Sequence, residues 1–193
     1  MNPDEFDAER FSRWIAYVLR HNPARYGLQP DQHGFVALEA FLDVARRRYP
    51  EMSSERLQAV VTTSGTERFH MDGARIRARY GHSIPVDPIG PAIEPPPSLY
   101  QGTESARTAA VLSDGLQPYD RRLLHLSGTL DEGYAVARRK TDQPAVVHID
   151  AQAAHQAGVE FYHEGRVYLA RHVPAQFLTL APLGAVPVSH EKS

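Results

Sequence analysis

The chain has 193 residues, of which 42% are apolar and 23% are charged, a balance typical of a globular protein that buries a hydrophobic core. It contains no cysteine, which excludes disulfides, thiolate nucleophiles and cysteine-based zinc sites. The net charge of −2 excludes a large positive field that would attract nucleic acid without selectivity.

The N-terminal sequence MNPDEFDAERF is acidic and lacks the basic and then apolar layout of a secretory signal. No apolar run approaches the roughly 18 residues of a membrane span. We therefore expect a soluble, cytoplasmic protein that does not bind membranes. No feature of the sequence requires more than a monomer or an obligatory protein partner.

Apolar spacing predicts three helices in the first part of the chain. In the first helix the spacing i, i+3, i+4, i+7 gives one apolar face, formed by Phe11, Trp14, Ile15 and Val18. This helix should end at Asn22-Pro23, because the residue before a proline avoids the helical region. The second helix is expected over about 37–48, and the third should begin near Ser54.

A β-hairpin is predicted for RFHMDGARIRARY, residues 68–80. Asp72-Gly73 separates two segments of alternating polarity, and the glycine supplies the positive φ of a type I′ turn. Three helices followed by a two-stranded wing predict a winged-helix-like lobe over residues 1–84. Such a lobe commonly meets nucleic acid, although it also docks proteins.

Arginine dominates the basic residues, since all of the 21 except Lys140 and Lys192 are arginine. Its planar guanidinium group matches phosphate oxygens in pairs, although a GC-rich genome would give the same bias. In the second strand of the hairpin, Arg75, Arg77 and Arg79 would leave one face, where like charges repel. A dianionic phosphate opposite them would turn this repulsion into binding. A solvated wing face would need no ligand.

Residues 85–97, PVDPIGPAIEPPP, contain six prolines and cannot form a helix or a central strand. We predict that they link the first lobe to a mixed α+β lobe over residues 98–181, which is followed by a loose tail at 182–193. The second lobe is expected to contain strands at 98–102, 123–128 and 144–151 and helices at 103–115 and 130–139. A hairpin is expected at 160–170, with its turn at Glu164-Gly165.

Three short motifs carry polar groups that are candidates for a binding or catalytic site. LYQGT places Gly102 and Thr103 at a strand end before a helix, where a pyrophosphate can approach the backbone and the helix N-terminus. Alternatively, Thr103 is only the N-cap of that helix. HLS, residues 125–127, places polar groups on an otherwise apolar strand. Arg20 and His21 end the first helix, where the helix dipole favours cations without any ligand.

No HExxH, GxSxG or Walker-type motif is present, so we expect no metal. The ordered set of motifs resembles the NAD-dependent RNA 2′-phosphotransferases, of the tRNA 2′-phosphotransferase type. The resemblance rests on SRWIAYVLRHNP, GLQPDQHGFVALEAFL, RFHMDGARIRARYGHS, LYQGT, HLS and PAVVHID. It runs from about Phe11 to Leu180, and the combination of LRH with IRA and GHS is its most specific part.

The resemblance implies an α+β enzyme of two lobes that acts in tRNA processing or RNA repair. The N-terminal lobe would be winged-helix-like and bind RNA, and the C-terminal lobe would have the ADP-ribosyltransferase-type fold that binds NAD. Carried over by motif, the catalytic residues are Arg20, His21, Arg77 and Arg139. Arg138 is the alternative to Arg139, because the local spacing is one residue longer than in the family.

The same resemblance implies contacts with both substrates. The residues expected to contact NAD are Tyr100, Gln101, Gly102, Thr103, His125, Leu126 and Ser127. The residues expected to contact the 2′-phosphorylated RNA are Arg75, Arg79, His82 and Ser83. This chain departs from the family at two positions, since Gln101 stands where the family commonly has histidine and Tyr80 where it commonly has glutamine.

The implied reaction has two steps and consumes NAD. A 2′-phosphate oxygen of RNA attacks the nicotinamide-bearing ribose carbon and expels nicotinamide. The adjacent ribose 2″-hydroxyl then attacks the phosphorus, which releases RNA with a 2′-hydroxyl and ADP-ribose 1″,2″-cyclic phosphate. Two alternatives stay open: ADP-ribosylation of a terminal phosphate of RNA or DNA, which stops after the first step, and a winged-helix regulator that binds nucleic acid without turnover.

Overall fold

The computed structural model describes residues 7–63 and 67–182, and the chain divides into two compact units. The first unit comprises Met1–Pro91, Pro118–Leu123 and Tyr162–Arg166, and the second comprises Ala92–Gln117, Leu124–Phe161 and Val167–Ser193. Two short segments from the second half of the sequence therefore belong to the first unit. The predicted tail lies, from residue 183 on, outside the described residues.

The three predicted helices of the first unit are confirmed as α1 (Ala8–His21), α2 (Leu38–Arg48) and α3 (Ser54–Thr63). Asp7 caps α1 by accepting a hydrogen bond from the backbone N–H of Arg10, and Asn22 ends the helix with a non-helical φ of −139°. A short 3₁₀ turn, Ala24–Tyr26, follows Pro23.

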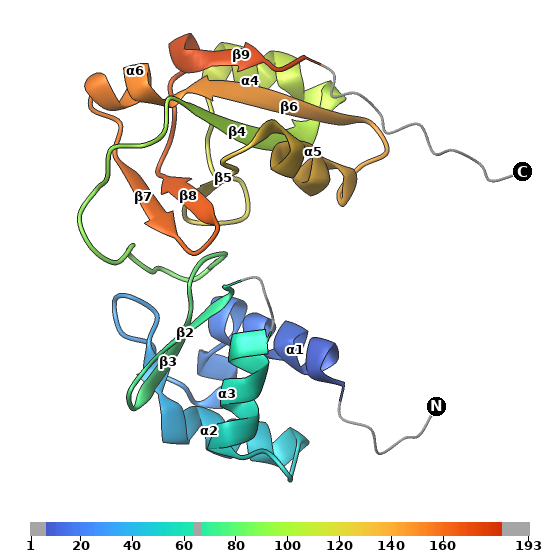
Figure 1. Ribbon diagram of the computed structural model, residues 1–193, viewed down its shortest axis with the longest axis vertical. Coiled ribbons are helices and arrows are strands. Elements are labelled where there is room, and N and C mark those ends of the chain that lie inside the picture. Colours follow the sequence, from blue (N-terminus) through green and yellow to red (C-terminus); the bar gives the residue numbers. More distant parts are fainter. Residues whose placement is uncertain (1–6, 64–66, 183–193) are drawn as a thin grey trace, which may run out of the picture. The chain divides into compact units, whose positions relative to one another are not determined.

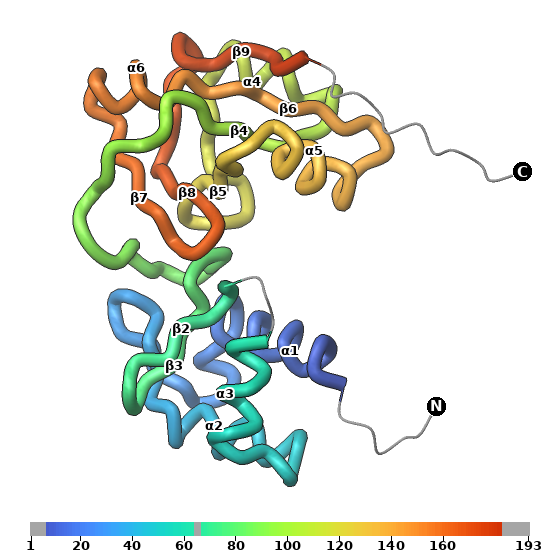
Figure 2. The backbone as a smooth tube through the Cα atoms, in the orientation of Figure 1, coloured from blue at the N-terminus to red at the C-terminus, as the bar shows by residue number. Residues whose placement is uncertain are grey.

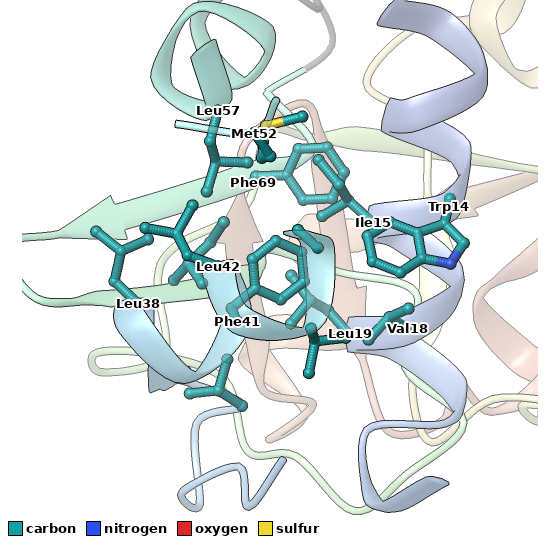
Figure 3. Close-up of a cluster of buried hydrophobic side chains, with 14 of the residues drawn as sticks. Trp14, Ile15, Val18, Leu19, Leu38, Phe41, Leu42, Met52, Leu57 and Phe69 are labelled. Atoms are coloured by element: carbon teal, nitrogen blue, oxygen red, sulfur yellow. The ribbon is translucent and has the colours of Figure 1, made fainter. Parts of the chain in front are cut away.

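The apolar faces of these helices form the core of the first unit. Figure 3 shows their side chains meeting in one cluster, which Phe69 of the following strand joins. The predicted face of α1 is confirmed, since Phe11, Ile15 and Val18 are fully buried and Trp14 is nearly so. Trp14 also contacts the rings of Phe11, Tyr26, Phe41 and Tyr49, so the helices are locked together by interdigitated aromatic rings.

A small antiparallel sheet completes the first unit, with β3 (Arg75–Ala78) between β1 (Val36–Ala37) and β2 (Phe69–Asp72). The predicted hairpin is confirmed, but its turn is not type I′. Asp72 pairs with Arg75, which leaves Gly73 and Ala74 as the loop, and of these two only Gly73 has a positive φ, 55°. A type I′ turn needs positive φ at both loop residues, which alanine adopts only with strain.

The proline-rich segment 85–97 forms no helix or regular strand, as its composition predicts (Figure 2). Its one pairing is an isolated bridge from Ile93 to Phe161.

The second unit is built on β4 (Ser98–Glu104) and β6 (Pro144–Asp150), which pair antiparallel along their whole length, with β9 (Leu178–Leu180) on the other edge of β6 (Figure 1). A second sheet has the order β5-β8-β7, formed by β5 (Leu124–Leu126), β8 (Val167–Ala170) and β7 (Phe161–Glu164). The remaining helices are α4 (Thr108–Asp114), α5 (Leu130–Arg138) and α6 (Ala151–Gln156). The fold is therefore mixed α and β with small antiparallel sheets.

Three sequence predictions for the second half of the chain need correction. The first strand continues to Glu104 and the helix begins only at Thr108, because Thr103 is used in the ladder opposite Ala145 and does not cap a helix. The predicted β7–β8 hairpin turns at Gly165-Arg166, one residue later than expected. The sequence analysis also missed α6 and β9. None of the helices in the described part of the chain is long and apolar enough to cross a bilayer.

Candidate active site

The segment after β3 holds the end of α1, where Arg20 and His21 lie. The backbone N–H of Ser83 donates to the carbonyl oxygen of Arg20 at 3.0 Å, and Oγ of Ser83 lies 2.9 Å from Nδ1 of His21. The second bond occupies Nδ1, so any contact that His21 makes with a substrate uses Nε2. Ser83, expected to contact RNA, thus orients the neighbouring histidine.

The side chain of Arg20 packs against the backbone of Gly81, where a larger residue would crowd it. Gly81 has a φ of 90°, and a Cβ atom there would lie 3.2 to 3.3 Å from Cδ, Nε and Cζ of Arg20. On its other side the guanidinium group lies over the ring of Tyr80, 5.1 Å from the ring centroid. Tyr80, one of the two departures from the family pattern, therefore supports Arg20 directly.

Two nitrogens of Arg20, Nε and Nη2, are buried and have no hydrogen-bond partner among the described residues. Leaving a buried polar group unpaired costs about 1–3 kcal/mol, and more when the group is charged. A phosphate offers paired acceptor oxygens that match these two donors. The arrangement is that of an anion site built around one guanidinium group.

The charge around Arg20 and His21 is predominantly positive. The pKa of Arg20 is lowered to about 10, chiefly by burial; Arg121 and Arg68 also lower it, while the charge of Tyr80 and a side-chain hydrogen bond with Tyr80 oppose the shift. Burial, Arg20 and Arg121 likewise lower the pKa of His21, against the opposing charge of Asp120. The lowered pKa favours the neutral ring, whereas a bound dianion would favour the protonated form.

Arg121 is a site residue that the sequence analysis missed. It lies in the segment Pro118–Leu123, which belongs to the first unit and is anchored by a 3.4 Å hydrogen bond from the backbone N–H of Arg122 to the carbonyl oxygen of His82. The available signal was the pair Arg121-Arg122 just before a predicted strand. Its proximity to Arg20 depends on a long-range contact that no local pattern encodes.

The two charges near His21 predict opposite shifts of its pKa. Replacement of Arg121 by methionine removes a nearby positive charge and should raise the pKa of His21, whereas Asp120→Asn removes a negative charge and should lower it. The measurement is an NMR titration of the His21 ring protons in the three proteins. Shifts of the same sign in both variants would show that the loop does not act on His21 through charge.

His82 lies in the interior of the first unit. It is 7% exposed, and burial, followed by the charges of Arg20 and Arg77, lowers its pKa to about 3. A Cβ atom at Gly34 would lie 3.2 Å from its Nε2, a nitrogen that has no partner among the described residues. The expected contact of His82 with RNA would require this ring to leave its packed position.

Arg77 is also buried, and its partners are protein groups. It is 1% exposed; its Nη2 lies 2.5 Å from a carboxylate oxygen of Glu164, and its Nη1 donates to the carbonyl oxygen of His33. The other oxygen of Glu164 accepts from the backbone N–H of Ile89. Glu164, which the sequence analysis assigned only to a turn, is therefore the charge partner of Arg77.

Arg75 and Arg79, the other two arginines of residues 75–79, have protein partners as well. Arg75 pairs with Asp72 at 2.6 Å and with Asp31 at 3.4 Å. Arg79 lies beyond the end of β3, where its Nε donates to the carbonyl oxygen of Phe69. Arg75 and Arg77 both lie over the ring of Phe35, and carboxylates of the chain itself are their charge partners. Contacts of Arg75 and Arg79 with RNA stay a prediction.

In the second unit, the two groups of residues expected to bind NAD are brought together. Tyr100 and Ser127 exchange two backbone hydrogen bonds, 3.0 and 2.8 Å long, that join β4 to the end of β5. Along β4 successive side chains point to opposite faces, so Gln101 and Thr103 share one face while Tyr100 and Gly102 share the other. His125 and Leu126 lie in β5 beside this junction.

Gln101 carries an unsatisfied acceptor. Its Nε2 donates to the carbonyl oxygen of Gly102 at 3.3 Å, while its Oε1 is buried without a hydrogen-bond partner among the described residues. An amide or hydroxyl donor of a ligand would satisfy this oxygen. The glutamine that replaces the family's usual histidine is therefore suited to a neutral polar contact.

Gly102 has a packing role. A Cβ atom on Gly102 would collide with the carbonyl oxygen of Gly133 and lie 2.9 Å from the backbone nitrogen of Ala137, both in α5. We expect Gly102→Ala to lower the free energy of unfolding by about 1–3 kcal/mol, because the helix must move away from β4. Denaturant-induced unfolding measures this change in the free energy of unfolding.

The control for that substitution is Gly128→Ala, where the nearest atoms would lie at ordinary contact distances of 3.5 and 3.9 Å. This change should leave the stability unchanged or raise it by up to about 1 kcal/mol. Equal losses in both variants would contradict the packing role of Gly102.

Arg138 and Arg139, the two candidates for the last catalytic arginine, are exposed at the end of α5. The guanidinium group of Arg138 lies over the ring of Tyr134, 5.4 Å from its centroid, and Arg139 is the C-cap residue. In the part of the chain that the structure describes, no three His, Asp or Glu side chains are grouped as metal ligands.

A partly buried arginine with two buried nitrogens that have no hydrogen-bond partner among the described residues, next to a histidine, can hold an anion such as phosphate. Residues 7–171 match the family described as RNA 2′-phosphotransferase, Tpt1 / KptA family, and the chain belongs to this family.

Relatives from archaea and bacteria match over nearly their whole lengths. A protein of Thermococcus kodakarensis is 34% identical over 176 residues, which is 91% of this chain and 98% of the relative. One of Streptomyces coelicolor is 36% identical over 170 residues, 88% of this chain and 93% of the relative. Each carries the name "Probable RNA 2'-phosphotransferase". Membership supports a transferase that removes a 2′-phosphate from RNA.

Proposed function

We propose that this chain removes an internal 2′-phosphate from RNA by transferring it to NAD, with release of nicotinamide and ADP-ribose 1″,2″-cyclic phosphate. The observation that carries the proposal is the guanidinium group of Arg20, whose Nε and Nη2 are buried without a hydrogen-bond partner among the described residues and suit two oxygens of an anion. This group lies in a chain of the RNA 2′-phosphotransferase family, for which a phosphate monoester is the fitting anion.

Arg20 would hold two oxygens of the 2′-phosphate and thereby fix the direction from which it attacks, a step that depends chiefly on positioning. Arg121 and Arg68 add positive potential at the same place. They would stabilise the additional charge that develops on the phosphorus during the second step.

His21 would move a proton in the second step. Its lowered pKa favours the neutral ring, which would accept the proton of the attacking ribose 2″-hydroxyl through Nε2. Ser83 holds Nδ1, which keeps the ring in one orientation throughout. The proton can then pass to the 2′-oxygen of the RNA as it leaves.

The second unit has groups that fit NAD. The buried acceptor of Gln101 suits the carboxamide of nicotinamide or a ribose hydroxyl, and Thr103 and His125 offer further polar groups. NAD would supply an electrophilic ribose carbon with a cationic leaving group, so the first step requires no strong acid. We accordingly propose a winged-helix-like lobe for RNA and an ADP-ribosyltransferase-like lobe for NAD. Arg77 and Arg139 complete the proposed catalytic set by resemblance.

The test is an analysis of the small phosphorus-containing products. The protein is incubated with NAD and a short RNA that has one internal 2′-phosphate, and the products are separated and identified by ³¹P NMR and mass. ADP-ribose 1″,2″-cyclic phosphate is the expected product. Inorganic phosphate in its place would refute transfer to NAD.

A matched RNA with a single terminal phosphate and no 2′-phosphate tests the related chemistry in the same assay. We expect this RNA to be recovered unchanged. An ADP-ribosylated end that persists, together with unreacted internal 2′-phosphate, would favour ADP-ribosylation of terminal phosphates as the function of the chain.

A further inference from the structure

Two aromatic side chains remain exposed in the part of the chain that the structure describes. Its exposed large apolar residues are Tyr17, Ile89, Tyr119 and Leu180. The two aromatic members are Tyr17, which is 42% exposed, and Tyr119, which is 85% exposed. Tyrosine combines a broad apolar face with a polar tip, so an exposed ring is suited to contacts with a partner. Both of these rings belong to segments that border Arg20 and His21.

Tyr17 lies one turn before His21 in α1, so both residues occupy the same face of the helix. The centroids of the two rings are 6.3 Å apart, and their planes are inclined by 51°. The helix backbone therefore fixes the ring of Tyr17 beside the imidazole of His21, with a large part of its surface open to solvent.

Tyr119 lies in the segment Pro118–Leu123, which belongs to the first unit, as Tyr17 does. The backbone N–H of Arg122 donates to the carbonyl oxygen of His82 and so anchors this segment. Ser83, which follows His82, forms a hydrogen bond with His21. Asp120, adjacent to Tyr119, is close enough for its charge to act on His21. The second exposed ring thus stands on a loop held next to the same histidine.

We propose that Tyr17 and Tyr119 form a nucleobase subsite, in which their rings stack on the bases of RNA at and next to the 2′-phosphorylated nucleotide. The inference rests on the proposed function, because it takes the 2′-phosphate to be bound by Arg20. In a nucleotide the base is attached to the ribose carbon beside the one that carries the 2′-phosphate. A phosphate at Arg20 therefore brings its base close to His21 and to these rings.

The charge of the chain makes stacking important for affinity. The net charge is −2, so general attraction to the phosphate backbone contributes little beyond the local anion site. Stacking on an aromatic ring is tolerant of sequence, because every base has a flat face. The subsite would therefore bind unpaired nucleotides of any sequence that carry a 2′-phosphate, since a base paired in a duplex offers no free face to either ring.

The test is equilibrium binding in the absence of NAD, measured by fluorescence anisotropy with two end-labelled single-stranded RNAs. Both RNAs carry one internal 2′-phosphate, and in the second RNA that nucleotide and its two neighbours lack their bases. We expect wild-type protein to bind the base-bearing RNA more tightly. Tyr17→Leu and Tyr119→Leu should each raise Kd for that RNA roughly 5- to 150-fold, and neither should change Kd for the RNA without bases.

Tyr17→Phe keeps the ring and should retain wild-type affinity, which separates stacking from a role of the hydroxyl group. Circular dichroism serves as the check that the variants fold. Equal affinity of the wild-type protein for the two RNAs would overturn the inference, as would leucine variants that weaken binding of both RNAs equally.

Addition of NAD to the same samples separates this inference from the proposed function. RNA that binds with base-dependent affinity but keeps its 2′-phosphate would refute the proposed function and leave the subsite in place. Removal of the 2′-phosphate together with base-independent binding would refute the subsite alone.

Discussion

Arg20→Met should lower kcat/KM for RNA with an internal 2′-phosphate by about 10²–10³-fold, the loss typical when a donor to a transition-state oxyanion is removed. Methionine retains an apolar stem that can lie over Tyr80 and Gly81, so the surroundings need not collapse. The substitution also removes two buried donors that have no partner among the described residues, which should leave the free energy of unfolding equal or higher. Single-turnover kinetics and denaturant unfolding measure the two quantities.

A combination of lost activity and retained stability is what distinguishes a binding group from a structural one. Arg20→Lys keeps the charge but loses the planar fork, so it should recover only part of the activity. Arg13→Met is the matched control, because Arg13 is an exposed arginine of the same helix that pairs with Glu9 at the surface. Wild-type kcat/KM in Arg20→Met would contradict the anion site.

Glu164→Gln should lower the free energy of unfolding by about 3–5 kcal/mol, because it leaves the guanidinium group of Arg77 buried without a counter-charge. The same carboxylate also accepts from the backbone of Ile89, so its loss weakens a second contact. Chemical denaturation followed by circular dichroism is the appropriate measurement.

An exposed ion pair provides the control for that loss. Glu39 lies 4.0 Å from Arg46 with its side chain 78% exposed, and Glu39→Gln should change stability by less than about 1 kcal/mol. The double variant Arg77→Met, Glu164→Met should regain most of the stability lost in the single variant, because it removes both charges. A loss below about 1 kcal/mol in Glu164→Gln would show that Arg77 finds another partner.

The helices of the first unit could be predicted from sequence because their signals are local. Apolar spacing and Asn22-Pro23 both lie within or beside α1. The missed elements had weaker signals. The strand β9 has only three residues, too few to show alternation, and α6 is a short helix whose one clear marker was its N-cap, Asp150.

Only part of the candidate site could be predicted from the sequence. Arg20 and His21 are adjacent in sequence and were selected together, but the bond from His21 to Ser83 spans 62 positions, and the pair of Arg77 with Glu164 spans 87. Alternation alone suggested that Arg75, Arg77 and Arg79 would share an open face. It gave no information on which carboxylates the fold would bring opposite them.

The most direct test of the proposed function follows the mass of one RNA. A short RNA with a single internal 2′-phosphate is mixed with the protein, with and without NAD, and with Arg20→Met in parallel. Conversion to the 2′-hydroxyl RNA is expected only with the wild-type protein and only when NAD is present. Unchanged RNA with folded protein and ample NAD, or equal conversion without NAD, would contradict transfer of the 2′-phosphate to NAD.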